Sequence, residues 1–172
     1  MTTVYTIGHS NTPVQALLDQ LTAAGIEIVV DIRRFPSSRR NPQFNATSLA
    51  ASLRGAGIEY QHAEALGGRR EPLPDSPNRA IASDQLRGYV DYSATPEFEA
   101  AEQQLLATAD QRRTAVMCAE AQPDDCHRFL LADALVACGH DVLHLVHGEL
   151  KPHQLSPIAR VDDGRVTYPA LL

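Results

Sequence analysis

The chain has 172 residues, of which 44% are apolar and 21% charged, and its formal net charge is −6. This length and composition are typical of one globular domain, here with residues 150–172 as a C-terminal tail packed on it, and they exclude disordered, fibrous and membrane-embedded classes. No apolar stretch is long enough to span a bilayer and no secretory signal is present, so we expect a cytoplasmic protein with no membrane partner.

The charge is unevenly distributed along the chain. Between Arg33 and Arg70 seven arginines stand against two acids, so this segment carries +5 and the remainder −11. The planar guanidinium group suits carboxylate and phosphate. The net charge argues against a general nucleic-acid binder, but the segment predicts either a local anion site or arginines that are solvated or paired with acids elsewhere.

The opening of the chain has the pattern of a strand, a helix and a second strand. Residues 4–7 are a short apolar strand, Thr12 is the predicted N-cap of a helix that begins at Pro13, and Gly25 ends that helix. Residues 26–32 are β-branched and apolar, as in a strand buried on both faces. This βαβ pattern predicts parallel strands.

The rest of the chain continues this alternation, which predicts a three-layer α/β domain with a mainly parallel sheet flanked by helices. Residues 67–83 show no periodicity and predict an irregular segment, either a binding loop or lid or a disordered stretch. The tail supplies a short edge strand or packs on the surface. The other predicted elements are a helix at 45–55 capped by Asn45, a strand at 58–61, a helix that starts at Thr95 and Pro96, a strand at 114–118, a helix at about 126–138 and a strand at 141–146.

Ionisable side chains follow several of the predicted strands. Because the carboxyl ends of parallel strands meet at one edge, and ligands bind beyond them, we expect these side chains to lie together. Taken singly, His9 is also explained as a turn or core histidine, and Asp31 as the partner of an arginine. The residues expected at this edge are His9 and Ser10 after the first strand, Asp31, Arg33 and Arg34 at the end of the second, Cys118 and Glu120 after the fourth, and His147 after the fifth.

The stretch MCAEAQPDDCHR joins a strand to a helix. With Asp124 or Asp125 as the N-cap, Cys126, His127 and Arg128 fall in the first helical turn. The free N–H groups and the helix dipole favour an anion there, either a phosphate or carboxylate held with Arg128 or a Cys126 thiolate with a lowered pKa. The two aspartates oppose the thiolate by like-charge repulsion, so we favour a bound anion.

Cys118 ends a predicted strand, where Glu120 and His127 are candidate bases for a nucleophilic thiol. The alternative is a small buried apolar residue, and core packing also explains Cys138. An odd number of cysteines predicts reduced thiols rather than a disulfide scaffold. A reversible disulfide between Cys118 and Cys126 requires that the loop between them folds back, and a reducing compartment disfavours it.

Spacing tests two further cysteine chemistries. Cysteine phosphatases and rhodanese-like enzymes close a short loop around the anion, and phosphatases place an arginine directly after it. The sixth residue after Cys118 is Asp124 and the sixth after Cys126 is Ala132, so the spacing excludes this site. Zinc sites usually use cysteines about two to four residues apart, which these are not. A metal site assembled from distant residues stays open, with the ligands Cys118, Cys126, His127 and His9.

Five motifs occur in order along the chain, namely TIGHSN, DIRRFPSSRRNPQFN, LGGRR, YVDYSATPEFEAA and CAEAQPDDCHR. With them, the stretch from Tyr5 to Val146 resembles the bacterial and archaeal family called domain of unknown function 488. The resemblance implies a compact α/β domain and supplies no established activity or catalytic role. Its signature positions in this chain are His9, Ser10, Asp31, Arg33, Cys118, Glu120, Cys126, His127 and Arg128.

These observations lead to one functional hypothesis and two alternatives. We expect the protein to bind a small anionic ligand, either a phosphate-bearing nucleotide or a nucleic-acid end, and to act on it by hydrolysis or group transfer. The alternatives are a non-catalytic module that binds nucleic acid or an acidic protein through the 33–70 segment, and a Cys/His metal-binding domain. No pattern specifies a cofactor or an oligomeric state. The candidate catalytic residues are Cys118, Glu120, His9, Cys126 and His127, and the candidate ligand-binding residues are Ser10, Asp31, Arg33, Arg34 and Arg128.

Overall fold

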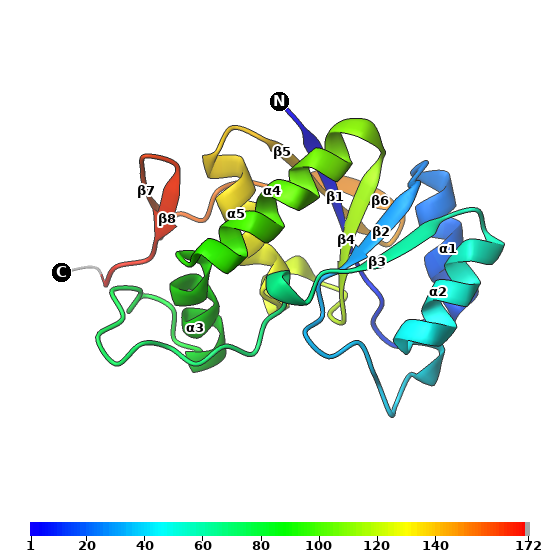
Figure 1. Ribbon diagram of the computed structural model, residues 1–172, viewed down its shortest axis with the longest axis horizontal. Helices are drawn as coiled ribbons and strands as arrows, with labels where there is room; N and C mark the ends of the chain where they lie inside the picture. The colour runs from blue at the N-terminus through cyan, green and yellow to red at the C-terminus, as the bar shows by residue number, and fades with distance from the viewer. Residues whose placement is uncertain (171–172) are drawn as a thin grey trace.

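The computed structural model describes residues 1–170, apart from the side chain of Asp125. Within this range a six-stranded sheet has the order β3-β2-β4-β1-β5-β6 (Figure 1). Strands β1 to β5 are parallel and β6 pairs antiparallel with β5 at one edge, which confirms the mainly parallel sheet. The strands are β1 Thr3–Gly8, β2 Ile28–Asp31, β3 Glu59–His62, β4 Thr114–Cys118, β5 Asp141–Val146 and β6 Glu149–Pro152.

Helices cover both faces of the sheet. One face packs against α1 Val14–Ala23 and α2 Ala46–Gly55, and the other against α3 Asp84–Ser93, α4 Pro96–Gln111 and α5 Arg128–Ala137 (Figure 1). Each face has its own apolar core, because alternate residues of a strand point to opposite sides. The first core contains Ile7, Leu17, Leu21, Leu53 and Met117, and the second contains Val4, Phe98, Leu105, Val116 and Leu131. This arrangement is the predicted three-layer α/β architecture.

The C-terminal segment is attached to α5 by a buried polar network. The hairpin of β7 Arg160–Asp162 and β8 Arg165–Thr167 is followed by Tyr168, whose hydroxyl donates to Asp133 Oδ2 at 2.6 Å. Asp133 Oδ1 lies 2.8 Å from His153 Nε2, and His153 Nδ1 lies 2.8 Å from His144 Nε2. The network therefore links the tail through α5 to the central part of the sheet.

The structure corrects the predicted helix starts. The N-cap of α1 is Pro13, while the hydroxyl of Thr12 donates to the carbonyl of His9 at 2.8 Å. Asn45 is the N-cap of α2, but its side-chain oxygen accepts from the Ser38 N–H and does not cap the helix. Short polar side chains also serve loops in this way, which is why a capping motif alone did not identify the start.

Helix α5 begins two residues later than predicted. Pro123–Asp125 form a 3₁₀ turn, and the N-cap of α5 is His127 rather than Asp124 or Asp125. Cys126 therefore precedes the helix and does not lie in its first turn. The start of α4 was predicted correctly, since Thr95 is its N-cap and its side chain accepts from the Phe98 N–H.

Helix α3 was not predicted. Its ten residues include Gly88 and three acidic or serine positions, and only Gly88, Tyr89, Val90 and Asp91 are buried. The backbone of the 67–83 segment packs so closely on this helix that a Cβ at Gly88 would lie 2.0 Å from the Arg70 carbonyl oxygen. This tertiary contact is not visible in local periodicity. Within residues 1–170, no helix has the length and apolarity required to cross a membrane.

The topology opens a crevice at one edge of the sheet. Strand β4 lies between β1 and β2, and the chain leaves β1 and β2 toward the α1/α2 face but leaves β4 toward α5. Connections that diverge in this way leave space beyond the carboxyl ends of the strands, where ligands of open α/β sheets bind. In Figure 1 this edge lies at the lower side of the sheet, above the loop that projects between β2 and α2.

Candidate functional site

A cavity of about 750 Å³ lies at the carboxyl ends of β1, β2 and β4. Eight of the ten predicted site residues line it, so the expected convergence at this edge is present. Asp31 and Arg128 are fully buried below the cavity, and His147 is exposed in the turn before β6 and is not part of the lining. The eight lining residues are His9, Ser10, Arg33, Arg34, Cys118, Glu120, Cys126 and His127.

Gly8 brings the loops after β1 and β4 into contact. A Cβ at this position would lie 1.6 Å from the carbonyl oxygen of Glu120, so the close approach requires glycine. Just beyond it, the His9 N–H donates to the Cys118 carbonyl and the Ser10 N–H to the Ala119 carbonyl. Ser10 has a φ of 49°, a conformation that non-glycine residues rarely adopt. The two loops are therefore fixed against each other at the cavity wall.

His9 is held by a chain of buried polar groups. Its Nδ1 lies 2.7 Å from the Ser10 carbonyl and must donate to it, which leaves Nε2 to accept from Arg33 Nη1 at 3.4 Å. The ring also stacks on Phe44 with a centroid distance of 4.4 Å. Burial is the main cause that lowers the pKa of His9, assisted by the charge of Arg33. His9 therefore presents a neutral imidazole to the cavity.

Arg33 is paired within the protein. Its Nε and Nη2 donate to the two carboxylate oxygens of Asp31 at 2.9 and 2.7 Å, and Nη2 also donates to the Phe44 carbonyl. The Tyr60 hydroxyl donates to the same carboxylate at 2.7 Å. Asp31, which is fully buried, thus fixes the orientation of Arg33, and Arg33 fixes that of His9. Sequence reasoning did not identify Tyr60, because a tyrosine in a short edge strand has no distinguishing signal.

The two cysteines of the cavity interact with each other. Cys118 at the end of β4 and Cys126 before α5 are 1% and 7% exposed, and both line the cavity, close enough that each shifts the pKa of the other. Burial raises the pKa of Cys118, but the neighbouring Cys126 and the positive charge of Arg128 outweigh burial, so the pKa lies below its usual value. The neighbouring Cys118 raises the pKa of Cys126. Cys118 is therefore the thiol of the pair that loses its proton more easily.

Arg128 is a buried cation directly behind the thiols. Its Nη2 donates to the carbonyls of Glu120 and Ala121 at 3.2 and 3.1 Å, while Nε and Nη1 have no hydrogen-bond partner among the described residues. Its backbone N–H donates to Cys126 Sγ at 3.2 Å. Among the described side chains, which do not include that of Asp125, no carboxylate forms a salt bridge with it. The charge of a buried guanidinium favours the ionised form of an acidic group nearby, and it lowers the pKa of Cys118.

His127 lies beside Cys126. Its Nε2 donates to the Ile32 carbonyl at 2.9 Å, which leaves Nδ1 as an acceptor 3.7 Å from Cys126 Sγ. Burial is the main cause that lowers the pKa of His127 to about 4. The ring is thus neutral near pH 7, and so low a pKa makes it a weak base toward a thiol whose own pKa is raised. His127 therefore offers Cys126 a hydrogen-bond acceptor that the Ile32 carbonyl holds in place.

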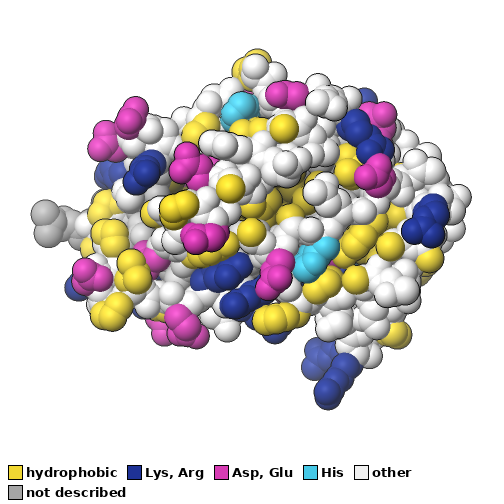
Figure 2. Space-filling view, viewed as in Figure 1, with side chains coloured by type: hydrophobic (Ala, Val, Ile, Leu, Met, Phe, Trp, Pro, Cys, Tyr) yellow, Lys and Arg dark blue, Asp and Glu magenta, His cyan; other side chains and the backbone are white. Residues whose placement is uncertain are grey.

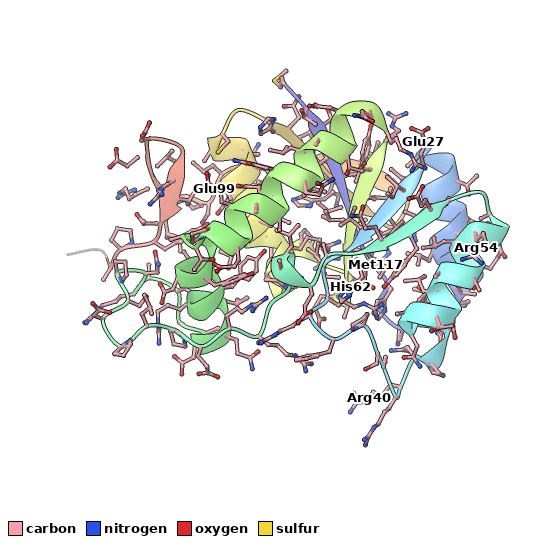
Figure 3. The ribbon with its side chains drawn as sticks, in the orientation of Figure 1. Glu27, Arg40, Arg54, His62, Glu99 and Met117 are labelled. Atoms are coloured by element: carbon pink, nitrogen blue, oxygen red, sulfur yellow. The ribbon has the colours of Figure 1, made fainter. Side chains whose placement is uncertain are left out.

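Three arginines give the cavity a positive rim. Arg34, Arg40 and Arg69 line it, and none of them forms a salt bridge within the described part of the chain. Arg40 extends from the tip of the projecting loop (Figure 3), and Figure 2 shows basic side chains gathered along this lower part of the molecule. Phe35, which is 56% exposed, lies beside the Arg34 guanidinium, 5.3 Å from ring centroid to Cζ. Glu120, which is exposed, is the acidic residue in the cavity lining.

The metal alternative gains no support from the geometry. Among the described residues no three His, Cys, Asp or Glu side chains are arranged to hold a metal ion. Nε2 of His127 faces a carbonyl and Nε2 of His9 faces Arg33, so neither ring turns this nitrogen toward the two thiols.

Comparison with known proteins places the chain in a family. The family model described as "Domain of unknown function DUF488" matches residues 13–135, which is well over half of the chain. The chain belongs to the DUF488 family. No curated protein and no solved structure matches the chain. Membership of DUF488 agrees with the motif resemblance, and it brings no activity with it.

Proposed function

We propose that this DUF488 protein binds a phosphate-bearing ligand of nucleotide size in the 750 Å³ cavity and acts on it by hydrolysis or group transfer, with Cys118 as the nucleophile. The observation that carries the proposal is the position of Cys118. Its thiol lines a polar cavity and shares the Glu120 carbonyl with the buried Arg128, which forms no salt bridge among the described side chains. A thiolate stabilised in this way is the reactive form of cysteine.

The ligand class follows from the lining. The volume lies within the range of about 300–1,000 Å³ that small-molecule sites occupy. Arg34, Arg40 and Arg69 offer guanidinium groups that suit phosphate, and the exposed ring of Phe35 offers a face on which a base can stack. The sequence predicted that Arg33 and Arg128 bind the ligand directly. Here Arg33 instead orients His9, and Arg128 stabilises the Cys118 thiolate.

The remaining groups supply proton transfer. Glu120 and His9 both line the cavity and are the proposed acid/base groups for the ligand, and His127 is the proposed hydrogen-bond acceptor for the Cys126 thiol. Imidazole and carboxylate groups are among those that general acid–base catalysis uses most often. Ser10 is positioned to contact the ligand from the loop after β1.

A protection experiment tests binding and thiol chemistry together. Iodoacetamide alkylation of the full-length protein is followed by peptide mass spectrometry at pH 7, with and without adenosine 5′-monophosphate. We expect Cys118 to react at least about tenfold faster than Cys138, because thiolate is the nucleophile. The nucleotide should slow alkylation of Cys118 and leave Cys138 unchanged. Adenosine alone and inorganic phosphate alone separate the contributions of the base and the phosphate.

Two variants and a matched control locate the ligand contacts. Arg69→Gln and Phe35→Ala should each weaken nucleotide binding about tenfold in calorimetry, since phosphate and stacking contacts contribute on the order of 1–3 kcal/mol each. Arg54→Gln should leave binding unchanged, because Arg54 lies on α2 away from the cavity (Figure 3). Equal alkylation of Cys118 and Cys138, with no protection by any of the three probes, contradicts the proposal.

A second candidate function rests on the projecting loop. Arg39 and Arg40 are exposed there beside the exposed Phe35, the combination of cations and aromatic ring that single-stranded nucleic acids contact. A non-catalytic nucleic-acid module would bind a labelled single-stranded oligonucleotide with an affinity that falls steeply with salt. Cys118→Ser should not change that affinity. Absence of binding at low salt removes this candidate and leaves the small-ligand proposal in place.

A further inference from the structure

The two cavity thiols have a relation that the proposed ligand chemistry does not use. Seven residues separate Cys118 from Cys126, and the loop between them folds back so that both thiols line the same cavity and each shifts the pKa of the other. Cys118 Sγ also lies 3.6 Å from the carbonyl oxygen of Glu120. Nucleophilic catalysis needs one thiol. A second thiol beside the first is the arrangement of an attacking and a resolving cysteine.

The surroundings of the pair differentiate the two sulfurs. Cys118 lies next to the buried guanidinium of Arg128, whose Nε and Nη1 have no hydrogen-bond partner among the described residues. Cys126 instead accepts the Arg128 backbone N–H and has the acceptor Nδ1 of His127 at 3.7 Å. One sulfur is therefore placed to react as a thiolate, and the other is held as a thiol in the same cavity.

We propose that Cys118 and Cys126 form a redox-active pair that reduces a small peroxide and is itself oxidised to a disulfide. The Cys118 thiolate attacks one peroxide oxygen, so that an S–O bond forms, the O–O bond breaks and Cys118 becomes a sulfenic acid. The leaving hydroxide takes up the proton that Cys118 had released and becomes water. This step transfers two electrons from sulfur to the peroxide.

The second step closes the disulfide. Cys126 attacks the sulfur of Cys118, so that the S–S bond forms and the S–O bond breaks, and the Cys126 proton passes to the departing hydroxide. That hydroxide leaves as a second water. The sum is one hydrogen peroxide and two thiols converted to one disulfide and two waters. An external dithiol regenerates the pair by exchange.

Burial makes the pair selective for small oxidants. Cys118 and Cys126 are 1% and 7% exposed and are reached only through the cavity, whereas Cys138 is exposed. The Sγ of Cys138 donates to the Gly164 carbonyl at 3.4 Å, and burial and the charge of Glu102 raise the pKa of this thiol. The third cysteine is therefore an internal control, since accessibility alone would make it the first to oxidise.

The experiment uses the full-length protein and hydrogen peroxide. Trypsin releases both cavity cysteines on one peptide, residues 114–128, whose mass falls by two hydrogen atoms when the disulfide forms. We expect this change in wild type and in Cys138→Ser, its reversal by dithiothreitol, and oxidation at least about tenfold faster than that of Cys138. In Cys126→Ser, dimedone should label Cys118, because the sulfenic acid has no resolving partner.

Two results would contradict the proposed redox reaction. Oxidation of Cys138 at the same rate as the pair, or over-oxidation of Cys118 without a disulfide in wild type, overturns the proposal. The wild-type measurement decides even if a cysteine variant fails to fold, which circular dichroism reports. Because no nucleotide is present, a negative result here leaves the proposed ligand function untouched, and failure of nucleotide binding leaves this redox reaction untouched.

Discussion

Asp31 and Arg33 form a buried ion pair next to the cavity, and this pair holds His9 in position. The bidentate pair is almost fully buried, with Asp31 at 0% and Arg33 at 7% exposure, and it orients His9 through Arg33 Nη1. Removal of one partner from a buried pair leaves an uncompensated charge, which destabilises proteins strongly. The pair therefore stabilises the fold only when both charges are present.

We predict that Asp31→Asn lowers the free energy of unfolding by on the order of 3 kcal/mol, measured by urea denaturation. Asn keeps one acceptor oxygen but leaves Arg33 without a counter-charge. The control is Asp162→Asn, the same substitution at an exposed position of β7, where a change within about 0.5 kcal/mol is expected. Equal effects of the two substitutions would show that the buried pair contributes nothing beyond surface charge.

The roles of the residues at the site could be predicted only in part from the sequence. The convergence of His9, Cys118 and His127 followed from the parallel sheet, because the ends of parallel strands share an edge. The sequence also predicted Arg34 at this edge and offered Asp31 as the partner of an arginine, but that Arg33 is this partner and that Arg69 lines the cavity depend on loop conformations that no periodicity encodes. The proximity of Cys118 and Cys126 likewise depends on the path of the loop that joins them.

At the scale of elements, the long apolar segments were predictable and the polar ones were not. Strands β4 and β5 have the predicted bounds, because each is short, rich in apolar residues and bounded by polar residues or glycine. Helix α3 was missed because its buried face is short and its contacts come from the 67–83 segment. The start of α5 was misplaced because a 3₁₀ turn satisfies the same sequence pattern as a cap.

The junction between the loops after β1 and β4 gives a prediction at this scale. A Cβ at Gly8 would lie 1.6 Å from a backbone oxygen that cannot rotate away, so Gly8→Ala must displace the Cys118–Arg128 loop. We expect a loss of at least about 3 kcal/mol in the free energy of unfolding and slower alkylation of Cys118. Gly55→Ala, where no atom lies within 4 Å, should be neutral or stabilising by up to about 1 kcal/mol. A Gly8→Ala protein as stable as wild type would show that the two loops are not in contact in solution.

At the scale of the whole molecule, three histidines removed from solvent occupy two polar networks of the fold. His9 and His127 line the cavity, and His144 on β5 belongs to the network that holds the C-terminal segment. His144 also forms a hydrogen bond with Thr6 of the central strand β1, in which His144 Nδ1 and Thr6 Oγ1 are 2.6 Å apart. That residues 1–172 form one domain stays a prediction, and this network is the feature that favours it.

The same histidines set the pH dependence of stability. Burial is the main cause that lowers the pKa of all three, for His127 to about 4 and for His144 to about 3, the latter also through His153 and Arg128. Their folded-state pKa values lie below the unfolded value of about 6.5, so the unfolded chain binds more protons as the pH falls. The stabilisation is therefore complete above about pH 6.5 and is lost progressively between that pH and about pH 4.

We predict that the free energy of unfolding falls between pH 7 and pH 5, by up to about 1.4 kcal/mol per pH unit for each histidine that stays neutral in the fold. Urea denaturation at a series of pH values measures the slope. His144→Gln should be less stable at pH 7 but should show a slope smaller by about one proton, because one buried imidazole is gone. His147→Asn removes an exposed histidine and should retain the wild-type slope. If His144→Gln leaves the slope of the free energy of unfolding against pH unchanged, His144 becomes protonated within the fold. A buried neutral network would then be the wrong description of how the C-terminal segment is held.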